Sequence, residues 1–218
     1  MARRVKPRRT YSTALRRRQA ELTRERVVSA ARQALVRGVY SKVTIEEIAR
    51  EAGVAYQTVY ALFRTKLGLA DAVIAADWPH ISAAIAAFDA GTRSADAARW
   101  LDGLAAMSRQ IYEPCADLMR FLRESGDADL LMRYHEVEKG RFARLAPLRK
   151  LLEKTDKLKP AVTAAEAVDM VWALTSPDHY IELVFERGWS AERYQSWLTR
   201  TLHDLVLRAA RGKGRATA

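Results

Sequence analysis

The chain has 218 residues, of which 49% are hydrophobic and 29% charged, and its formal net charge is +11 at pH 7. This length is enough for a small domain and a larger one. The single cysteine, Cys115, excludes an intramolecular disulfide, and no apolar run is long enough to cross a membrane. Strand-like alternation of β-branched residues is also absent, so the sequence predicts an all-α fold.

The N-terminus is strongly basic. Residues 1–20 hold eight basic residues and no acidic one, residues 21–66 carry a net charge of +3, and residues 67–218 sum to zero. All the net charge therefore lies beside the first helices, which is the electrostatic footprint of a surface that binds a polyanion. We expect residues 1–20 to form a disordered basic arm that lies along DNA phosphates or enters the minor groove. The alternative is a solubilising tail. The arginines assigned to DNA contacts in this arm are Arg3, Arg4, Arg8, Arg9, Arg16, Arg17 and Arg18.

A first helix is expected over residues 23–37. Thr23 stands at its N-cap position, and Gly38 follows as a stop signal. One apolar face is formed by Val27, Ala31, Ala34 and Leu35. This helix precedes the part of the sequence that carries most of the functional signal.

Residues 44–66 predict two short helices joined by a tight glycine turn, the pattern of a helix-turn-helix DNA reader. Thr44 and Glu47 have the spacing of a capping box, which marks the start of the first helix. Gly53 ends that helix in a left-handed conformation that glycine adopts at little cost. The second helix is expected from Val54 through Phe63.

The outer face of the second helix carries side chains suited to DNA. Gln57 has the amide geometry to hydrogen-bond a base edge, and Tyr56 and Tyr60 can reach bases or phosphates. Ala61 lets the helix sit close to the duplex and offers a methyl group to thymine. The residues assigned to phosphate contacts on chemical grounds are Thr58 and Lys66. The alternative is an ordinary pair of amphipathic helices with solvated tyrosines.

This region resembles the TetR family of transcriptional regulators. The resemblance lies in Thr44-Ile-x-x-Ile-Ala-x-x-Ala-Gly53-Val54, then Thr58-Val59-Tyr60-x-x-Phe63-x-x-Lys66 and Leu69, and it covers about residues 21–69. It implies a phosphate contact at Thr44, base reading by Tyr56 and Gln57, and backbone anchoring by Thr58, Tyr60 and Lys66. Tyr56 and Ala61 depart from residues common in the family, so the resemblance does not supply the operator sequence. A weaker resemblance to one branch of the family covers Trp172 to Asp178 and Glu186 to Leu198.

Residues 67–210 predict a larger helical domain, to which the resemblance assigns effector binding and dimerisation, followed by a flexible tail at 211–218. A capping box at Thr163 and Glu166 marks one of its helices. The helices are expected at 67–88, 94–112, 114–124, 127–153, 163–175, 177–187 and 190–210. The resemblance implies a small-molecule effector of unknown identity in an apolar cavity, and no cofactor. The candidate lining residues are Trp100, Met107, Tyr112, Met119, Phe121, Tyr134 and Met170, for each of which core packing is the alternative.

The last two helices, 177–187 and 190–210, are expected to form a homodimer interface. The final helix has Leu198, Leu202 and Leu205 along one face. The resemblance implies a four-helix bundle with a second subunit, which presents two recognition helices to a roughly palindromic operator. Burial of this apolar stripe inside a single subunit is the alternative.

No catalytic or metal-binding arrangement stands out. The histidines are scattered, and neither His135 with Glu136 and Glu138 nor Asp178 with His179 has a recognised ligand spacing. We therefore expect a non-enzymatic, cytoplasmic, nucleoid-associated regulator: a homodimeric repressor released from its operator by a small molecule. The first alternative is a non-specific architectural DNA-binding protein, and the second is a sensor that acts through protein contacts.

Overall fold

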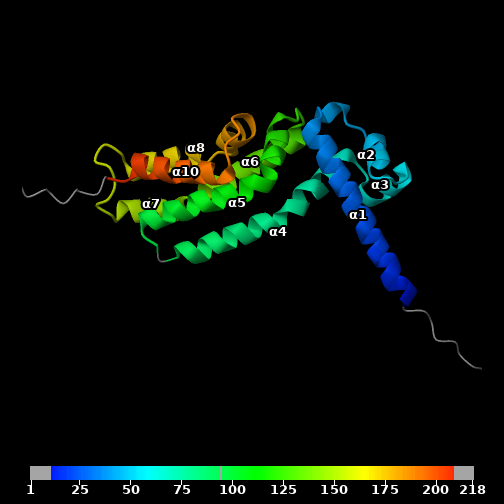
Figure 1. Ribbon diagram of the computed structural model, residues 1–218, viewed down its shortest axis with the longest axis horizontal. Helices are drawn as coiled ribbons and strands as arrows, with labels where there is room; N and C mark the ends of the chain where they lie inside the picture. The colour runs from blue at the N-terminus through cyan, green and yellow to red at the C-terminus, as the bar shows by residue number, and fades with distance from the viewer. Residues whose placement is uncertain (1–10, 94, 209–218) are drawn as a thin grey trace, which may run out of the picture. The chain divides into compact units, whose positions relative to one another are not determined.

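The structure, a computed structural model, describes residues 11–93 and 95–208 (Figure 1). Over those ranges the fold is all-α, as the sequence predicts, apart from an isolated bridge between Leu158 and Leu207. None of the helices in this part of the chain combines the length and apolar character needed to cross a membrane. The chain divides into two compact units, Met1–Ala76 and Asp77–Ala218, and each is described by itself.

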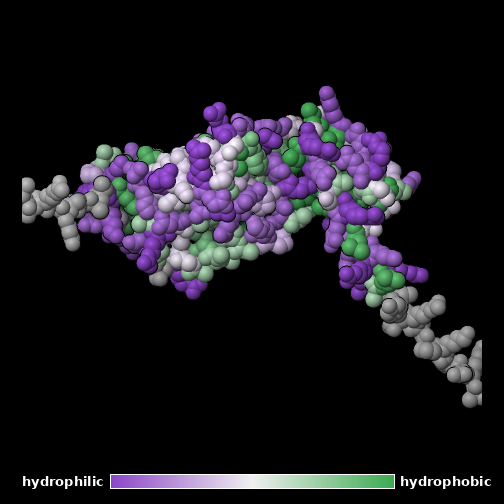
Figure 2. All heavy atoms as spheres, in the orientation of Figure 1, coloured by the Kyte–Doolittle hydropathy of each residue, from purple (hydrophilic) through white to green (hydrophobic). Residues whose placement is uncertain are grey.

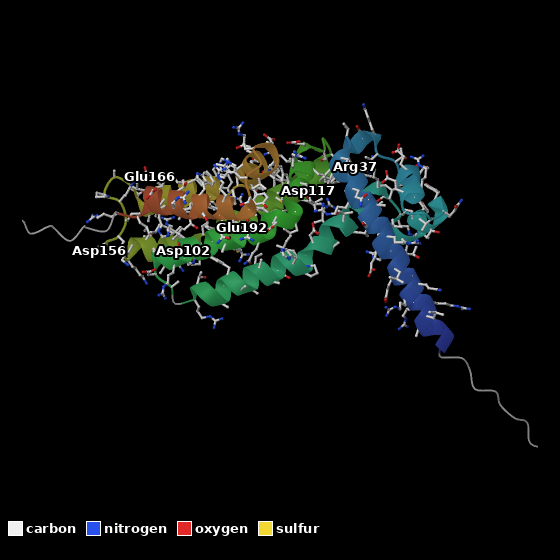
Figure 3. The ribbon with its side chains drawn as sticks, in the orientation of Figure 1. Arg37, Asp102, Asp117, Asp156, Glu166 and Glu192 are labelled. Carbon is white, nitrogen blue, oxygen red and sulfur yellow. The ribbon has the colours of Figure 1, made fainter. Side chains whose placement is uncertain are left out.

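The first unit contains the predicted helix-turn-helix. Its elements are α1 (Tyr11–Arg37), the 3₁₀ turn η1 (Tyr40–Lys42), α2 (Ile45–Glu51), α3 (Tyr56–Phe63) and the beginning of α4 (Lys66–Thr92). Its core is built from aliphatic side chains that are at most 1% exposed, among them Val27, Leu35, Ile48 and Val59. Arg37, labelled in Figure 3, joins the end of α1 to α2 through two 3.2 Å hydrogen bonds from Nη2 to the carboxylate of Glu51.

The start of α1 differs from the expected disordered arm. Residues 1–10, with Arg3, Arg4, Arg8 and Arg9, lie outside the described residues, but α1 begins at Tyr11 and so includes residues 11–20. Residues 14–20 are alanine, leucine, arginine and glutamine, which all have high helix propensity, and residues 11–20 lack glycine and proline. The expectation weighted charge over propensity and was wrong for residues 11–20.

The second unit is a helical bundle. It consists of the rest of α4 followed by α5 (Ala97–Glu124), α6 (Ala128–Ala143), α7 (Ala146–Glu153), α8 (Ala164–Leu174), α9 (Pro177–Tyr180), the π-helical turn η2 (Ile181–Glu186) and α10 (Ala191–Val206). α10 packs along α5 and α8, and α7 packs on α8 (Figure 1). Side chains at or near zero exposure fill the centre, among them Leu101, Leu148, Leu198 and Leu202.

A single helix, α5, replaces the two helices expected at 94–112 and 114–124. Pro114 lies inside it and has no N–H to donate to the carbonyl oxygen of Gln110 four residues earlier. His80 of α4 places Nε2 at 2.7 Å from that oxygen, so the ring nitrogen donates the missing hydrogen bond. The helix therefore continues through the proline because a side chain from another helix satisfies the freed carbonyl.

The remaining boundaries follow local signals. The helix expected at 127–153 is interrupted after Ala143, because Pro147 stands in the first turn of α7 and starts a new helix there. The capping box at Thr163 and Glu166 is present at the start of α8, where Figure 3 labels Glu166. The segment expected as one helix at 177–187 is a short α-helix that continues as a π-helix.

Candidate nucleic-acid interface

The turn between α2 and α3 is held by backbone geometry. The Thr44 hydroxyl accepts a hydrogen bond from the Glu47 N–H at 3.2 Å, and the Thr44 N–H donates to the Glu47 carboxylate at 3.1 Å. Gly53 has a φ of +64°, a conformation that glycine adopts without strain, and Val54 N–H donates to Ala49 O at 3.0 Å. These contacts fix the direction in which α3 leaves the turn.

α3 buries one face and exposes the other. Val59 and Phe63 are 1% and 7% exposed, and the guanidinium of Arg24 in α1 lies over the Phe63 ring at 4.8 Å. Sequence reasoning missed this support by Arg24, because nothing local to either residue indicates it. The helix starts at Tyr56 rather than Val54, since Ala55 is the N-cap with extended backbone.

The exposed face holds the predicted base readers. The side chains of Gln57 and Ala61 are exposed, and Tyr56 and Tyr60 are 39% and 49% exposed. The two tyrosine rings stack with centroids 6.2 Å apart and planes inclined by 22°. They form a flat aromatic ridge one turn long beside the glutamine amide. Thr58 is half-buried next to this face.

Lys66 has a different role from the phosphate contact that the sequence predicts. Its ammonium donates hydrogen bonds to Tyr40 O at 2.8 Å and Val43 O at 3.1 Å, and it lies over the Tyr40 ring at 4.2 Å. An ammonium has three donors, so two of them are used inside the first unit. Lys66 joins the start of α4 to the η1 turn, a structural role that the sequence does not predict, and its phosphate contact stays a prediction.

The remaining predicted contacts divide between exposed and undescribed residues. Thr44 is exposed, and its O–H stays available while its oxygen serves as the helix cap. Arg16, Arg17 and Arg18 are exposed on α1.

The seven predicted effector residues lie in the second unit with different degrees of burial. Trp100, Met107, Tyr112 and Phe121 are buried in the second unit, and Met119, Tyr134 and Met170 are half-buried. A groove of about 300 Å³ is lined by Trp100 together with Phe88, Arg144 and Pro147, among others. A second groove of about 510 Å³ is lined by His135, Glu138, Lys139, Phe142, Ala143 and Trp172. Of the seven, only Trp100 lines either of these two grooves.

A buried polar cluster borders the second groove. Arg141 Nη1 donates to Glu138 Oε2 at 2.5 Å, and Nη2 donates to Trp172 O at 2.9 Å and to Thr175 Oγ1 at 3.4 Å. The Tyr112 hydroxyl donates to Thr175 O at 2.7 Å. Burial raises the pKa of Tyr112 to about 12, although the positive charge of Arg141 opposes the shift. Glu138 and Arg141 look in sequence like a surface pair, so this cluster was not predicted.

Three buried polar atoms beside this cluster have no hydrogen-bond partner among the described residues. They are Glu138 Oε1, Trp172 Nε1 and Tyr194 Oη. A buried polar atom without a partner costs about 1–3 kcal/mol. The cluster therefore offers one acceptor and two donors, and Glu138 and Trp172 also line the second groove. Over residues 11–93 and 95–208, no group of three or more His, Cys, Asp or Glu side chains is placed to hold a metal ion.

The predicted dimer stripe is mostly internal. Leu198 and Leu202 are 0% exposed and lie in the core of the second unit, so they are buried within one chain, as the alternative had it. Phe185 is 46% exposed, and Trp197 and Leu205 are only partly buried. The apolar surface that α9, η2 and α10 leave uncovered lies on these residues. α10 ends at Val206, and residues 209–218 lie outside the described part of the chain.

Comparison with known proteins gives a family for the first unit. Residues 27–73 match the model described as bacterial regulatory proteins, tetR family. No curated protein sequence matches the chain.

Solved structures share the fold over most of the chain. A putative transcriptional regulator from Saccharomonospora viridis in complex with choline is 18% identical, with a TM-score of 0.63 over 85% of this chain and 97% of that one. FadR from Bacillus subtilis in complex with stearoyl-CoA is 17% identical, with a TM-score of 0.62 over 82% and 96%. NalD, the secondary repressor of the MexAB-OprM efflux pump in Pseudomonas aeruginosa, is 20% identical, with a TM-score of 0.59 over 88% and 100%. At these identities the likeness establishes the fold alone.

Proposed function

We propose that this chain, whose residues 27–73 match the model of the tetR family of bacterial regulatory proteins, is a sequence-specific DNA-binding regulator of transcription. In this proposal it acts as a cytoplasmic repressor rather than an enzyme, and a small molecule releases it from its operator. The observation that carries the proposal is the outer face of α3, where Tyr56, Gln57, Tyr60 and Ala61 are exposed on a helix anchored by buried Val59.

That face suits the major groove for physical reasons. A glutamine amide can make two hydrogen bonds to an adenine edge, a contact that discriminates by about 1–3 kcal/mol against other bases. Ala61 keeps the helix close to the duplex. No side chain caps the N-terminus of α3 at Ala55, which leaves the positive end of the helix open to a phosphate. The net charge of +11 supplies attraction that does not depend on sequence.

The first experiment measures binding of the purified protein to DNA flanking its own gene, against scrambled DNA of equal length, at physiological salt with excess competitor. We expect selective binding of the flanking DNA. Gln57→Ala should reduce the ratio of affinities for flanking and scrambled DNA by about 5- to 150-fold, as expected for one bidentate base contact. Gln33→Ala is the matched control, because Gln33 is an exposed glutamine on α1 of the same unit. If the wild type binds scrambled DNA as tightly as the flanking DNA, and as tightly as any sequence selected from random DNA, the architectural alternative is favoured.

We also propose that two copies associate through α9, η2 and α10. A dimer presents two α3 helices to two half-sites, which one helix alone would bind weakly. Phe185 is exposed on this surface, so Phe185→Glu should shift the mass in solution from dimer to monomer, while Phe142→Glu, which changes an exposed phenylalanine on α6, should not. A wild-type protein that is monomeric at micromolar concentration would contradict the proposal.

Effector release is the remaining part of the proposal. Relatives with this fold are described in complex with choline and with stearoyl-CoA. We propose that a small molecule binds the second unit of this chain and lowers operator affinity. Coupling between the two ligands must be reciprocal, so operator DNA should weaken binding of that molecule by the same factor. A compound that binds at saturation without changing operator affinity is not the effector.

A further inference from the structure

The first half of α1 projects beyond the packed part of its unit. Among the described side chains of α1, which start at Ala14, the first that is buried is Val27. Every described side chain from Ala14 to Arg26 is exposed except Thr23, which is half-buried. The family match also begins at Val27, so the projecting segment, residues 14–26, lies outside it. The projecting segment is therefore a feature of this chain that the packing of the unit does not explain.

The projecting segment can remain helical with few tertiary contacts of its own. The unfavourable step in helix formation is the first turn, and the packed residues from Val27 onward already provide it. Adding residues to an existing helix costs little when they are good helix formers, as Ala14 to Leu22 are. The Thr23 hydroxyl donates to Gln19 O at 2.8 Å within the same helix. The segment thus acts as a rigid rod rather than a flexible tail.

This rod is basic. It carries five arginines against two glutamates, which are Arg16, Arg17, Arg18, Arg24, Arg26, Glu21 and Glu25. The five further basic residues at 1–10 precede it in the sequence. Figure 2 shows the projecting end of α1 mainly as hydrophilic surface interrupted by hydrophobic patches.

The rod starts beside the recognition helix. Arg24 stacks on Phe63 of α3 at 4.8 Å, so α1 still contacts α3 at that position. A helix rises about 1.5 Å per residue, so the residues from Arg24 back to Arg16 extend about 12 Å further. At about 3.4 Å per base pair, 12 Å corresponds to about four base pairs. Guanidinium groups at the far end are thus within reach of DNA beyond the segment that α3 reads.

A membrane surface and a second copy of the chain fit the rod less well than DNA does. A helix that lies on a membrane needs a broad apolar face, and the rod has only Leu15 and Leu22, which are 53% and 51% exposed. The same two leucines are too few for a coiled-coil seam with a second copy. Arginine side chains are common phosphate contacts, and the rod carries three of them in a row at Arg16 to Arg18.

We propose that residues 14–26 of α1 bind the phosphate backbone of the DNA that flanks the operator half-site read by α3. The inference rests on the proposed function for the position of the operator, but not for the affinity of the rod for DNA. Arg16, Arg17 and Arg18 supply the contacts furthest from α3. The rod lengthens the protected DNA by about four base pairs per subunit and adds affinity that falls with salt.

The test compares wild type with the triple variant Arg16→Gln, Arg17→Gln and Arg18→Gln, which removes charge but keeps helix-forming residues. Each protein is titrated with two duplexes, the minimal operator and the same operator with about ten base pairs added on each side, between 50 and 200 mM salt. One phosphate contact contributes a slope of about 0.9 in log affinity against log salt, so three lost contacts reduce the slope by about 2.7 per subunit. That difference amounts to about 40-fold in affinity over this salt range. We expect this difference between wild type and the triple variant on the long duplex only.

A charge-matched control removes three exposed basic residues of the second unit, Arg99→Gln, Arg149→Gln and Lys150→Gln. It should retain the wild-type slope on both duplexes. Ala20→Pro keeps every charge but interrupts the rod, and it should lose the advantage of the long duplex. Wild-type behaviour of Ala20→Pro would refute the rigid helix, and a wild-type slope and footprint in the triple arginine variant would refute the DNA contact.

The outcomes separate this inference from the proposed function. Operator selectivity with no effect of the arginine variant keeps the proposed function and overturns the rod. If the protein shows no operator selectivity but the arginine variant has a reduced salt slope on any long duplex, the proposed function fails and the DNA contact of the rod stands. Binding of wild type to vesicles containing phosphatidylserine, lost in the arginine variant without any change in DNA binding, would replace DNA by a membrane surface.

Discussion

The buried ion pair of α6 allows a stability prediction with an internal control. Arg141 and Glu138 are three residues apart, 2.5 Å from nitrogen to oxygen, and both side chains are 16% exposed. Lys139 and Glu136 have the same spacing and the same distance on the same helix, but they are 71% and 65% exposed. Burial is therefore the main difference between the two pairs.

Arg141→Met leaves the Glu138 carboxylate buried, with Oε1 already lacking a partner and Oε2 losing its own. An uncompensated buried charge costs about 3–5 kcal/mol of unfolding free energy. Glu138→Leu leaves the guanidinium with Trp172 O and Thr175 Oγ1, so only one charged hydrogen bond is lost, at about 1.5–3 kcal/mol. The double variant removes both charges and should be more stable than either single variant.

Urea unfolding followed by tryptophan fluorescence measures these differences, with Trp172 next to the substituted residues. Lys139→Met is the control and should change the unfolding free energy by less than about 1 kcal/mol, because exposed pairs contribute little. An Arg141→Met variant as stable as the control, or a double variant less stable than both singles, would refute the reasoning from burial.

Three further predictions test local features of the fold. His80→Ala should lower the free energy of unfolding, measured by urea denaturation, by about 0.5–1 kcal/mol, because Gln110 O loses its donor opposite Pro114. Adding Pro114→Ala should restore the lost stability, and no restoration would contradict the account. Gly53→Ala should destabilise the first unit by about 1–2 kcal/mol, seen as a lower melting temperature, because φ at this position is +64°. Gly53→Asn should destabilise it less, and equal losses in the two variants would argue against backbone strain. The hydrogen bond from Thr163 N–H, joined by the Thr163 hydroxyl, holds the pKa of Glu166 below its ordinary value of 4.5. Its contribution is therefore present above pH 4.5 and lost as the pH falls through the lowered pKa, so the melting-temperature difference between wild type and Glu166→Gln should shrink between pH 6 and pH 3. A constant difference would contradict the linkage.

Features set by neighbours in sequence were predictable. Both capping boxes, at Thr44 and at Thr163, are present because each is defined by two residues three positions apart. The glycine turn at Gly53 and the buried face of α3 follow from backbone freedom and helical periodicity. The exposed face of α3 was predictable for the same reason, because it is what remains once the apolar face is assigned.

Features set by distant partners were not predictable from sequence. Pro114 indicated a helix end, and only the position of His80 in the fold explains why α5 continues. Lys66 suited a phosphate by its chemistry, but the carbonyls of Tyr40 and Val43 take two of its donors. Glu138 and Arg141 have the spacing of a solvated pair, and their burial depends on α5 and α8 packing around them.

The two units share one continuous element, α4, and its residues belong to two different cores. Leu69 and Val73 are buried in the part that belongs to the first unit, and Phe88 is buried in the core of the second. Lys66 fixes the start of the helix through carbonyls of the same unit as α3. If a ligand in the second unit displaces α4, the displacement reaches the recognition unit only if the helix moves as a rod. Pro79, just past the division at Ala76, removes one backbone donor and is the position where bending costs least. The proposed effector response therefore depends on how stiff α4 is at Pro79.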